Sequence, residues 1–397
     1  MPDPSQKQSA QRGLWMLGMS ILCLNFGLAG HMSMNANFLQ ELIHVTPWQM
    51  GYLEAIREAC GIASFVLIGL LAGMAEHSLA GALLLLVGIG LTGYVAADSV
   101  KDVIIFSVIW SVGFHLWIPL STNMTLAFAR TGHAAERLGQ MRAVGAVGSL
   151  LGLGSIVVLA SGRLPAIGDV GMRHLFVLCG CVVLVAAIAS SRITGLKPPS
   201  VVKPWAFKRR YALYYLLTFL EGWRKQIFLS FATFALVREY GAPVHHIATL
   251  MFINLGINLV LAPAVGRLID RVGERAVLSV YYPVLAVVFV LYALIPYRTW
   301  LYSLYVVDNV LFVLALALPS YLNRVADPDD RRQCLAMGVT MNHIAAVLMP
   351  LLGGMLWQHY GYQIPFYCGA AVALVSLIVC QRIAAAGGPF RAPSPPT

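Results

Sequence analysis

The chain has 397 residues, of which 59% are hydrophobic and only 11% are charged, and its mean hydropathy is +0.75. A soluble domain of this length cannot bury so much apolar surface, whereas a membrane protein with many spans need not. The net charge of +10 does not indicate a nucleic-acid partner, because the basic residues lie in short segments between apolar runs.

Twelve apolar runs, each with about the 20 residues needed to cross a bilayer, follow one another along the chain. A basic linker at 192–210 divides them six and six, and polar tails at 1–13 and 384–397 are expected to be disordered. The pattern predicts an all-α integral membrane protein with two pseudo-symmetric six-helix bundles, 14–191 and 211–383. The runs are 14–40, 48–73, 79–97, 103–128, 139–160, 174–191, 211–238, 245–266, 276–296, 300–323, 334–357 and 362–383.

The distribution of Lys and Arg predicts the orientation of the chain. If both termini are cytoplasmic, nineteen of the 27 basic residues lie inside and five lie outside, which follows the positive-inside rule. We therefore expect a multi-pass protein of the plasma membrane, in bacteria the inner membrane, with both termini in the cytoplasm.

A short charged loop separates the eighth and ninth runs. It reads Gly266-Arg267-Leu268-Ile269-Asp270-Arg271-Val272-Gly273-Glu274-Arg275, and its pattern G-x-L-x-D-R-x-G-x-R resembles the signature loop of the major facilitator superfamily of secondary transporters. The twelve runs and the basic central linker are similar to that family too. The resemblance implies two six-helix bundles, transport by alternating access, and a cytoplasmic gate formed by Gly266, Asp270, Arg271, Gly273 and Arg275.

The matching loop between the second and third runs departs from the family pattern. It reads Gly69-Leu70-Leu71-Ala72-Gly73-Met74-Ala75-Glu76-His77. Gly73 replaces the aspartate of the motif, and no arginine follows it. The charged latch is therefore expected in the second half alone, where Asp270→Asn should shift the conformational balance or impair transport.

The fifth run carries Gly145, Gly148, Gly152 and Gly154. This spacing is similar to a glycine-rich motif of the family that is associated with exchangers, but the proline of that motif is absent. Small residues at this spacing also permit close packing of membrane helices, which is the interpretation we favour.

Charged side chains inside predicted spans are costly and mark candidate functional sites. Glu54, Arg57 and Glu58 share one face of the second helix, because they are three and four residues apart. Arg57 can pair with both acids, so at most one carboxylate remains uncompensated and available for proton coupling.

The seventh run repeats this arrangement with Glu221, Arg224 and Lys225. At 1.5 Å per residue Glu221 lies about 15 Å deep, close to the middle of the bilayer. The excess positive charge of Arg224 and Lys225 suits an anionic substrate group. Asp308 in the tenth run can take a proton or pair with one of these two bases. The alternative for all these charges is an ion-pair network that only holds helices together.

Uncharged polar residues follow the same logic. The family resemblance places helices 1, 4, 7, 8, 10 and 11 around the central cavity, and several polar side chains fall in them. The predicted cavity-lining residues are Asn25, His31, Asn35, His115, Asn123, Asn254, Asn258, Asn342 and His343.

No motif indicates an enzyme, a cofactor or a bound metal. The sequence lacks a phosphate-binding loop followed by Lys and Ser or Thr, and its seven cysteines have no metal-ligand spacing. We expect a secondary active transporter for a small organic, anionic solute, coupled to protons, acting as a monomer in the lipid bilayer. The alternatives are a transporter-like sensor or scaffold that does not transport, and a transition-metal transporter, for which nearby Met and His residues such as Met341 and His343 give weak support.

Overall fold

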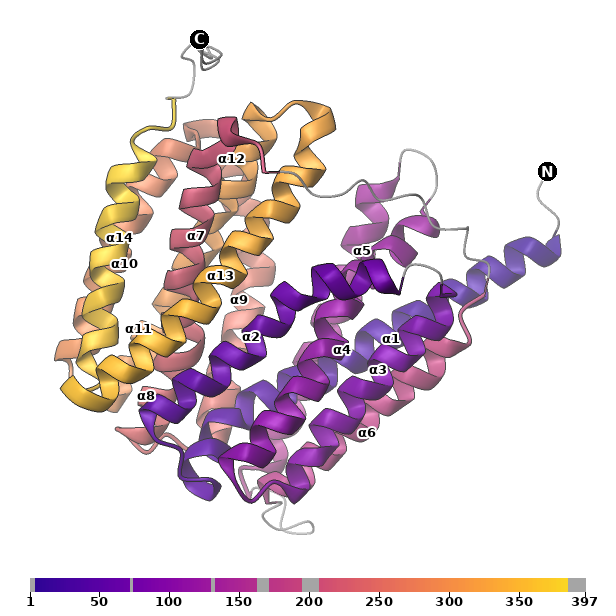
Figure 1. The fold of residues 1–397 in the computed structure, drawn as a ribbon, viewed down its shortest axis with the longest axis horizontal. Coiled ribbons are helices and arrows are strands. Elements are labelled where there is room, and N and C mark those ends of the chain that lie inside the picture. Colours follow the sequence, from indigo (N-terminus) through magenta and orange to yellow (C-terminus); the bar gives the residue numbers. More distant parts are fainter. Residues whose placement is uncertain (1–3, 72–73, 130–132, 163–170, 195–206, 385–397) are drawn as a thin grey trace. The chain divides into compact units, whose positions relative to one another are not determined.

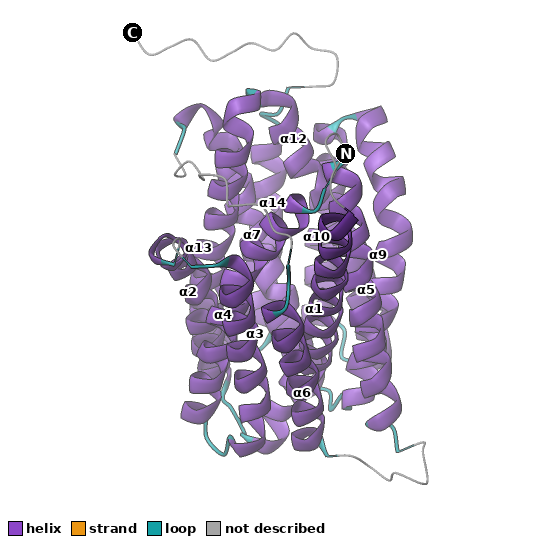
Figure 2. Ribbon diagram, turned by 90° about the vertical axis from the view of Figure 1, so that its right-hand side faces the viewer, coloured by secondary structure: helices purple, strands orange, loops and turns teal. Residues whose placement is uncertain are grey.

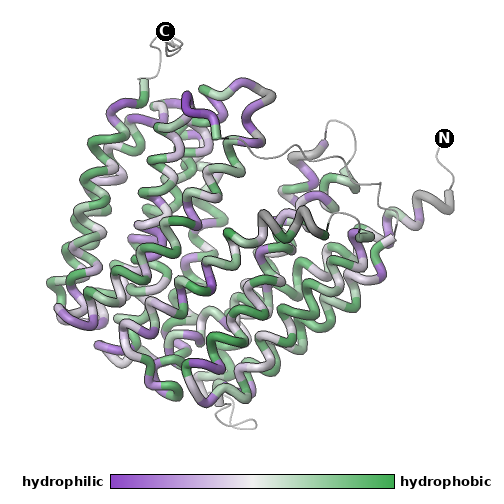
Figure 3. The backbone as a smooth tube through the Cα atoms, viewed as in Figure 1, coloured by the Kyte–Doolittle hydropathy of each residue, from purple (hydrophilic) through white to green (hydrophobic). Residues whose placement is uncertain are grey.

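The computed structural model describes residues 4–71, 74–129, 133–162, 171–194 and 207–384. Within these ranges every regular element is helical (Figure 2). Hydrophobic residues predominate along the helices (Figure 3). A chain that spans a membrane must satisfy its backbone hydrogen bonds within each segment, and helices do so. The predicted all-α membrane fold is confirmed.

The contacts divide the chain into two compact units. The first unit contains residues 1–45, 56–201 and 242–252, and the second contains 46–55, 202–241 and 253–397. Two helices contribute residues to both units, namely α2 (Pro47–Leu70) and α9 (Val244–Val272).

The helices of each unit follow the chain. The first unit contains α1 (Pro4–Asn37), the π-helical turn η1 (Phe38–Leu42), α3 (Glu76–Gly93), η2 (Tyr94–Ala96), α4 (Val100–Ala127), α5 (Ala134–Leu159) and α6 (Met172–Ser191). The second contains η3 (Arg209–Tyr211), α7 (Ala212–Gln226), the π-helical η4 (Ile227–Ala232), α8 (Thr233–Arg238), α10 (Glu274–Leu294), α11 (Arg298–Val313), η5 (Leu314–Leu316), α12 (Ala317–Val325), α13 (Pro328–Tyr360) and α14 (Gln363–Cys380).

The two units share one internal packing order. In the first, α1 packs against α5 and α6, while α3 packs against α4 and α6. In the second, α7 packs against α13 and α14, while α10 packs against α14, α11 and α12 (Figure 1). If α7 with η4 and α8 is counted as span 7, α10 as span 9, α11 with η5 and α12 as span 10, α13 as span 11 and α14 as span 12, the two units have corresponding packing pairs. Pairs 1–5, 1–6, 3–6 and 3–4 of the first unit correspond to pairs 7–11, 7–12, 9–12 and 9–10 of the second. The predicted pseudo-symmetry of the two halves is therefore visible in their packing.

Each predicted apolar run coincides with a helical stretch of the described chain, with two differences. Helix α1 begins at Pro4, so residues 4–13, expected to form a disordered tail, lie in a helix. Ten helical stretches among the described residues are long and apolar enough to cross a membrane, and they do not include α2 or the α7 to α8 stretch. Each of these two stretches carries a cluster of three charged residues. Residues 72–73, 195–206 and 385–397, on which parts of the predicted loop, linker and tail fall, lie outside the described residues.

The glycines of α5 lie directly against α1. A Cβ atom on Gly148 would stand 2.2 Å from the backbone oxygen of Leu22, and one on Gly152 would stand 2.3 Å from that of Phe26. No side chain fits into such a space. This geometry supports the packing interpretation of the glycine spacing.

The end of the basic linker is fastened to the start of α13. Lys208 and Arg210 both form ion pairs with Asp330, and the Tyr211 hydroxyl donates to the same carboxylate at 3.0 Å. These hydrogen bonds, with that from Lys208 the strongest, lower the pKa of Asp330 from 3.8 to about 2. Arg210 also pairs with Asp327 at 2.6 Å.

Candidate functional site

The deepest charged cluster of the second unit is built on α7. Glu221 and Arg224 are three residues apart and therefore share a helical face, and both are buried. Directly after Gln226 the helix changes to the π-helical η4. A π-helical segment inside a membrane helix often marks a functional position, because it redirects the side chains around it.

Arg224 forms an ion pair with Asp308 of α11. Its Nη2 atom also donates to the backbone oxygen of Asp308 at 3.0 Å. The side chains of Arg224 and Asp308 are 2% and 0% exposed, and the guanidinium carbon lies 4.8 Å from the ring centre of Phe312. The ion pair is therefore enclosed, with an aromatic ring against the cation.

Glu221 completes a buried triad. Its Oε1 lies 3.9 Å from Nε of Arg224, too far for a hydrogen bond. The Tyr281 hydroxyl of α10 donates to Oε1 at 3.0 Å and to Oε2 at 3.2 Å. Two carboxylates thus share one guanidinium inside the unit, and the triad carries a net negative charge unless one acid holds a proton.

Polar atoms without a hydrogen-bond partner surround this triad. In the described part of the chain they include Nη1 and Nε of Arg224, Oδ2 of Asp308 and the hydroxyls of Tyr282 and Tyr292. Buried polar groups usually have hydrogen-bond partners, and each exception calls for an explanation such as a functional role. The triad therefore has donor and acceptor atoms that can form further hydrogen bonds.

Lys225 lies beside the triad in a different environment. Its Nζ donates to the amide oxygen of Asn342 at 3.5 Å, and the side chain is only partly buried. Gly222 lets α7 approach α13 here, because a Cβ on it would stand 2.7 Å from the backbone oxygen of Asn342. Of the two predicted bases, Lys225 is thus the one without a carboxylate in hydrogen-bond range among the described residues.

The cluster on α2 is also buried. Arg57 pairs with Glu58 at 3.2 Å and lies 5.7 Å from the ring centre of Trp110. Ser111 of α4 donates to the backbone oxygen of Arg57 at 2.8 Å and lies 3.1 Å from the ring of His115. Glu54, which belongs to the second unit, accepts from Ser230 of η4 at 3.2 Å.

The predicted cavity-lining residues fall into different environments. His31 is fully buried inside the first unit, with the rings of Tyr94, Phe176 and Trp110 centred 4.6, 5.1 and 5.4 Å away. Asn25 donates to its own helix, at Ile21, over 2.8 Å. Asn35 and Asn254 are buried, Asn123 is exposed, and the intermediate positions are His115, Asn258, Asn342 and His343.

The buried charge of the predicted gate loop is Glu274, which lies between Gly273 and Arg275 and was not among the predicted gate residues. Asp270 and Arg271 are exposed and form no ion pair in the described part of the chain. Glu274 instead is 6% exposed, pairs with Arg324 of α12 at 3.0 Å and accepts from Ser320 at 3.0 Å. The gate role expected of Asp270, Arg271 and Arg275 stays a prediction.

The two motif glycines have different roles. Gly273 joins α9 to α10 with a φ of +85°, a conformation that favours glycine. Gly266 has open space where a Cβ would lie, and packing does not require it. Arg275 donates to Gln381 of α14 at 3.1 Å.

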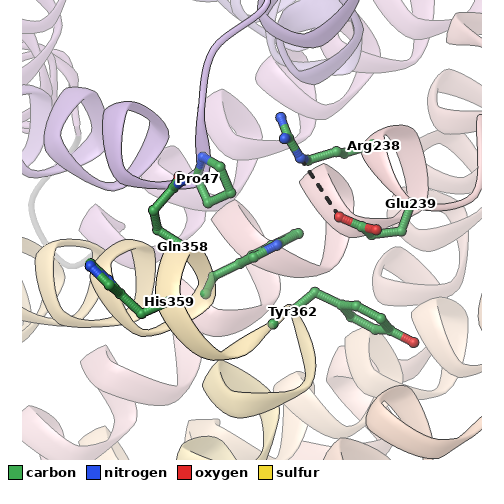
Figure 4. A pocket seen from close by; sticks show the side chains of 8 residues that line it. Pro47, Arg238, Glu239, Gln358, His359 and Tyr362 are labelled. Atoms are coloured by element: carbon green, nitrogen blue, oxygen red, sulfur yellow. Dashed lines mark ion pairs between the residues drawn. The ribbon is translucent and has the colours of Figure 1, made fainter.

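A hollow of about 280 Å³ opens beside the end of α8 in the second unit (Figure 4). Its wall contains a loose ion pair, Arg238 with Glu239 at 3.6 Å, and the aromatic rings of Trp357 and Tyr362. The volume is at the lower end of known ligand pockets, and no residue of the buried triad lines it.

Comparisons with known proteins support the resemblance seen in the sequence. Residues 214–395 match the family model of the Major Facilitator Superfamily. A comparison with curated proteins found no match. The solved nucleoside transporter NupG is similar over 94% of this chain and 98% of its own, with a TM-score of 0.73 and 13% identity.

Two further solved structures share the fold. A bacterial homologue of the human lysosomal transporter Spinster, in its inward-facing occupied conformation, matches 97% of this chain and 98% of its own (TM-score 0.76, 13% identity). A D-xylose-proton symporter matches 93% and 97% (TM-score 0.68, 13% identity). The chain shares the fold of these three solved transporters. The recognition made from the Gly266–Arg275 loop is confirmed by the match of residues 214–395 to the family model and by the shared fold.

Proposed function

We propose that this protein is a proton-coupled secondary transporter that moves a small organic anion by alternating access. The observation that carries the proposal is the buried triad of Glu221, Arg224 and Asp308. Its two acids and one base are each no more than 5% exposed. An uncompensated charge in such a place costs several kcal/mol, about 3–5 when one partner of a buried pair is removed. One shared proton makes the triad neutral.

The shared proton gives the triad two arrangements. When Asp308 is ionised it holds Arg224, and Glu221 carries the proton. When Asp308 is protonated, Arg224 is released and can close the 3.9 Å gap to Glu221. An exchange of partners between two helices, α7 and α11, links proton binding to helix position, which is what a coupled transporter requires.

Lys225 is the proposed contact for the anionic group of the substrate. Arg224 is occupied by Asp308, so its role is that of counter-charge. Lys225 is partly exposed and has an amide oxygen as its partner, and a carboxylate competes well for an ammonium group with so weak a partner. Asn342 then offers its amide group to the same ligand.

We further propose that both termini lie in the cytoplasm, in bacteria at the inner membrane, and that the monomer is the working unit. The excess of Lys and Arg in the assigned inner loops supports this orientation. The fold is compatible with proton coupling, since a D-xylose-proton symporter has it too.

The test uses purified protein in lipid vesicles that contain a pH-sensitive dye. Small mono- and dicarboxylates are added one at a time, each alongside its uncharged amide. We expect at least one carboxylate to drive a proton flux. Glu221→Gln and Asp308→Asn should abolish this flux while substrate exchange without net proton movement persists. Lys225→Gln should weaken the response to the carboxylate more than that to the amide.

A matched control is Asp98→Asn, because the Asp98 side chain is 82% exposed, and it should leave proton flux unchanged. Full proton flux in both Glu221→Gln and Asp308→Asn would overturn the proton site. Transport of solutes without any proton movement would remove the coupling, and a folded protein that transports none of the probes would favour the sensor or scaffold alternative.

A further inference from the structure

Tyr281 of α10 is the residue that contacts Glu221 from a neighbouring helix. It is fully buried, and its hydroxyl lies 3.0 Å from one oxygen of Glu221 and 3.2 Å from the other. The Arg224 nitrogen, at 3.9 Å, is beyond hydrogen-bond range. In the described part of the chain, Tyr281 therefore supplies the hydrogen bonds of this carboxylate.

One hydroxyl between two carboxylate oxygens favours the ionised acid. A hydrogen bond donated to a carboxylate stabilises its charged form, and it does so more strongly when water is excluded. Protonation of Glu221 weakens this bond because the acid then has less negative charge to accept it. The position of one phenolic hydroxyl thus opposes the uptake of a proton.

We infer that Tyr281 is a positioning residue that sets the pH range over which Glu221 takes up and releases a proton. The inference rests on the proposed role of Glu221 in proton coupling. It adds that a residue of α10, Tyr281, sets the pH at which Glu221 takes up a proton. Any movement of α10 against α7 that lengthens this hydrogen bond therefore makes Glu221 easier to protonate.

Other groups near Glu221 lie on its own helix and on neighbouring helices. On its own helix they are Arg224 and Lys225, on α11 it is Asp308, and on α10 the second tyrosine, Tyr282, also interacts with it electrostatically. Cys380 of α14 lies near Tyr282. On α13, the uncharged Asn342 accepts a hydrogen bond from Lys225.

Tyr282 provides the matched comparison. It is adjacent to Tyr281 and 1% exposed, but its hydroxyl has no hydrogen-bond partner in the described residues. Replacing either tyrosine by phenylalanine removes one buried hydroxyl and leaves the ring. Of the two substitutions, only Tyr281→Phe should remove a hydrogen bond to the Glu221 carboxylate.

The experiment is an infrared pH titration of the purified protein in lipid vesicles, which needs no substrate. The carbonyl band of a protonated carboxyl group is followed, and the part that disappears in Glu221→Gln is assigned to Glu221. Tyr281→Phe should shift the midpoint of this band upward by about one to two pH units, the effect of losing one hydrogen bond to a charged group. Tyr282→Phe should leave the midpoint unchanged.

A fluorinated tyrosine at position 281 provides a second variant that keeps the shape of the side chain. Its more acidic hydroxyl donates a stronger hydrogen bond, so the midpoint should move down. An unchanged midpoint in Tyr281→Phe or with the fluorinated residue, or an equal shift in Tyr282→Phe, overturns the inference while Glu221 remains a proton site. Absence of any band that depends on Glu221 overturns the proton site itself, and the inference with it.

Discussion

Asp330 shows how a single carboxylate fastens one segment of the chain to another. It is 5% exposed and accepts from Lys208, Arg210 and Tyr211, which precede α7. Its pKa of about 2 is below the ordinary 3.8. The folded state therefore binds this proton less readily than the unfolded state does, and the contact stabilises the fold most when Asp330 is ionised.

The pH dependence follows from that sign. The stabilisation is complete above about pH 4 and is lost as the pH falls toward about 2. We predict that Asp330→Asn lowers the melting temperature at neutral pH, and that the deficit shrinks as wild type and variant are acidified through this window. Thermal unfolding in detergent at a series of pH values measures it. The control is Asp327→Asn, because the Asp327 side chain is 63% exposed, and its loss in melting temperature should be smaller. If the loss in Asp330→Asn does not change with pH, the proposed mechanism is contradicted.

Sequence alone could predict part of the candidate site. The spacing of Glu221 and Arg224 placed them on one face, and Asp308 was one expected partner for a base of that helix. No spacing rule could find Tyr281, because it lies on α10, and tyrosines in apolar runs are common. The choice between Arg224 and Lys225 as partner of Asp308 depended on the packing of α7 against α11, which a single sequence does not contain.

At the scale of helices, the close approach of α1 and α5 gives a sharp prediction. Gly148→Ala places a methyl group 2.2 Å from the oxygen of Leu22, so the two helices must separate. We expect a loss of about 1–3 kcal/mol in unfolding free energy, as for overpacked cores, measured by denaturant unfolding in mild detergent.

The control for this prediction lies on the same helix. A Cβ on Gly154 meets one atom at 3.8 Å, an ordinary contact. Gly154→Ala should therefore be neutral or should stabilise the protein by up to about 1 kcal/mol, because alanine favours a helix more than glycine does. Equal losses in both variants would show that the α1 to α5 approach does not limit what position 148 can hold.

The fold was more predictable than the site for a physical reason. A bilayer imposes length and apolarity on every span, so the runs were visible one at a time, and α7 with η4 and α8 was found despite its charges. The full length of α1 was not predicted, because residues Pro4 to Gly13 are too polar to be recognised as part of a membrane span, although they continue the helix. Helix ends outside the hydrocarbon are set by local contacts, which hydropathy does not record.

At the scale of the whole molecule, the predicted gate loop, Gly266–Arg275, contains two acidic residues in different environments. The family motif drew attention to Asp270, but the buried ion pair is Glu274 with Arg324, which joins the start of α10 to α12. A charged pair that is partly buried and forms in one conformation stabilises that conformation relative to the others. An exposed aspartate without an ion-pair partner among the described residues does not.

We therefore predict unequal effects from two conservative changes. Glu274→Gln and Arg324→Gln should each shift the balance between inward-open and outward-open states by the same amount, and the double variant should shift it no further, because both remove one interaction. Asp270→Asn should shift it less. The populations can be measured as distances between spin labels, one in each half of the chain. If Asp270→Asn shifts the balance as much as Glu274→Gln does, then Asp270 gains a partner in another conformation and the latch expected from the motif is restored. If neither change shifts it, the loop only joins α9 to α10.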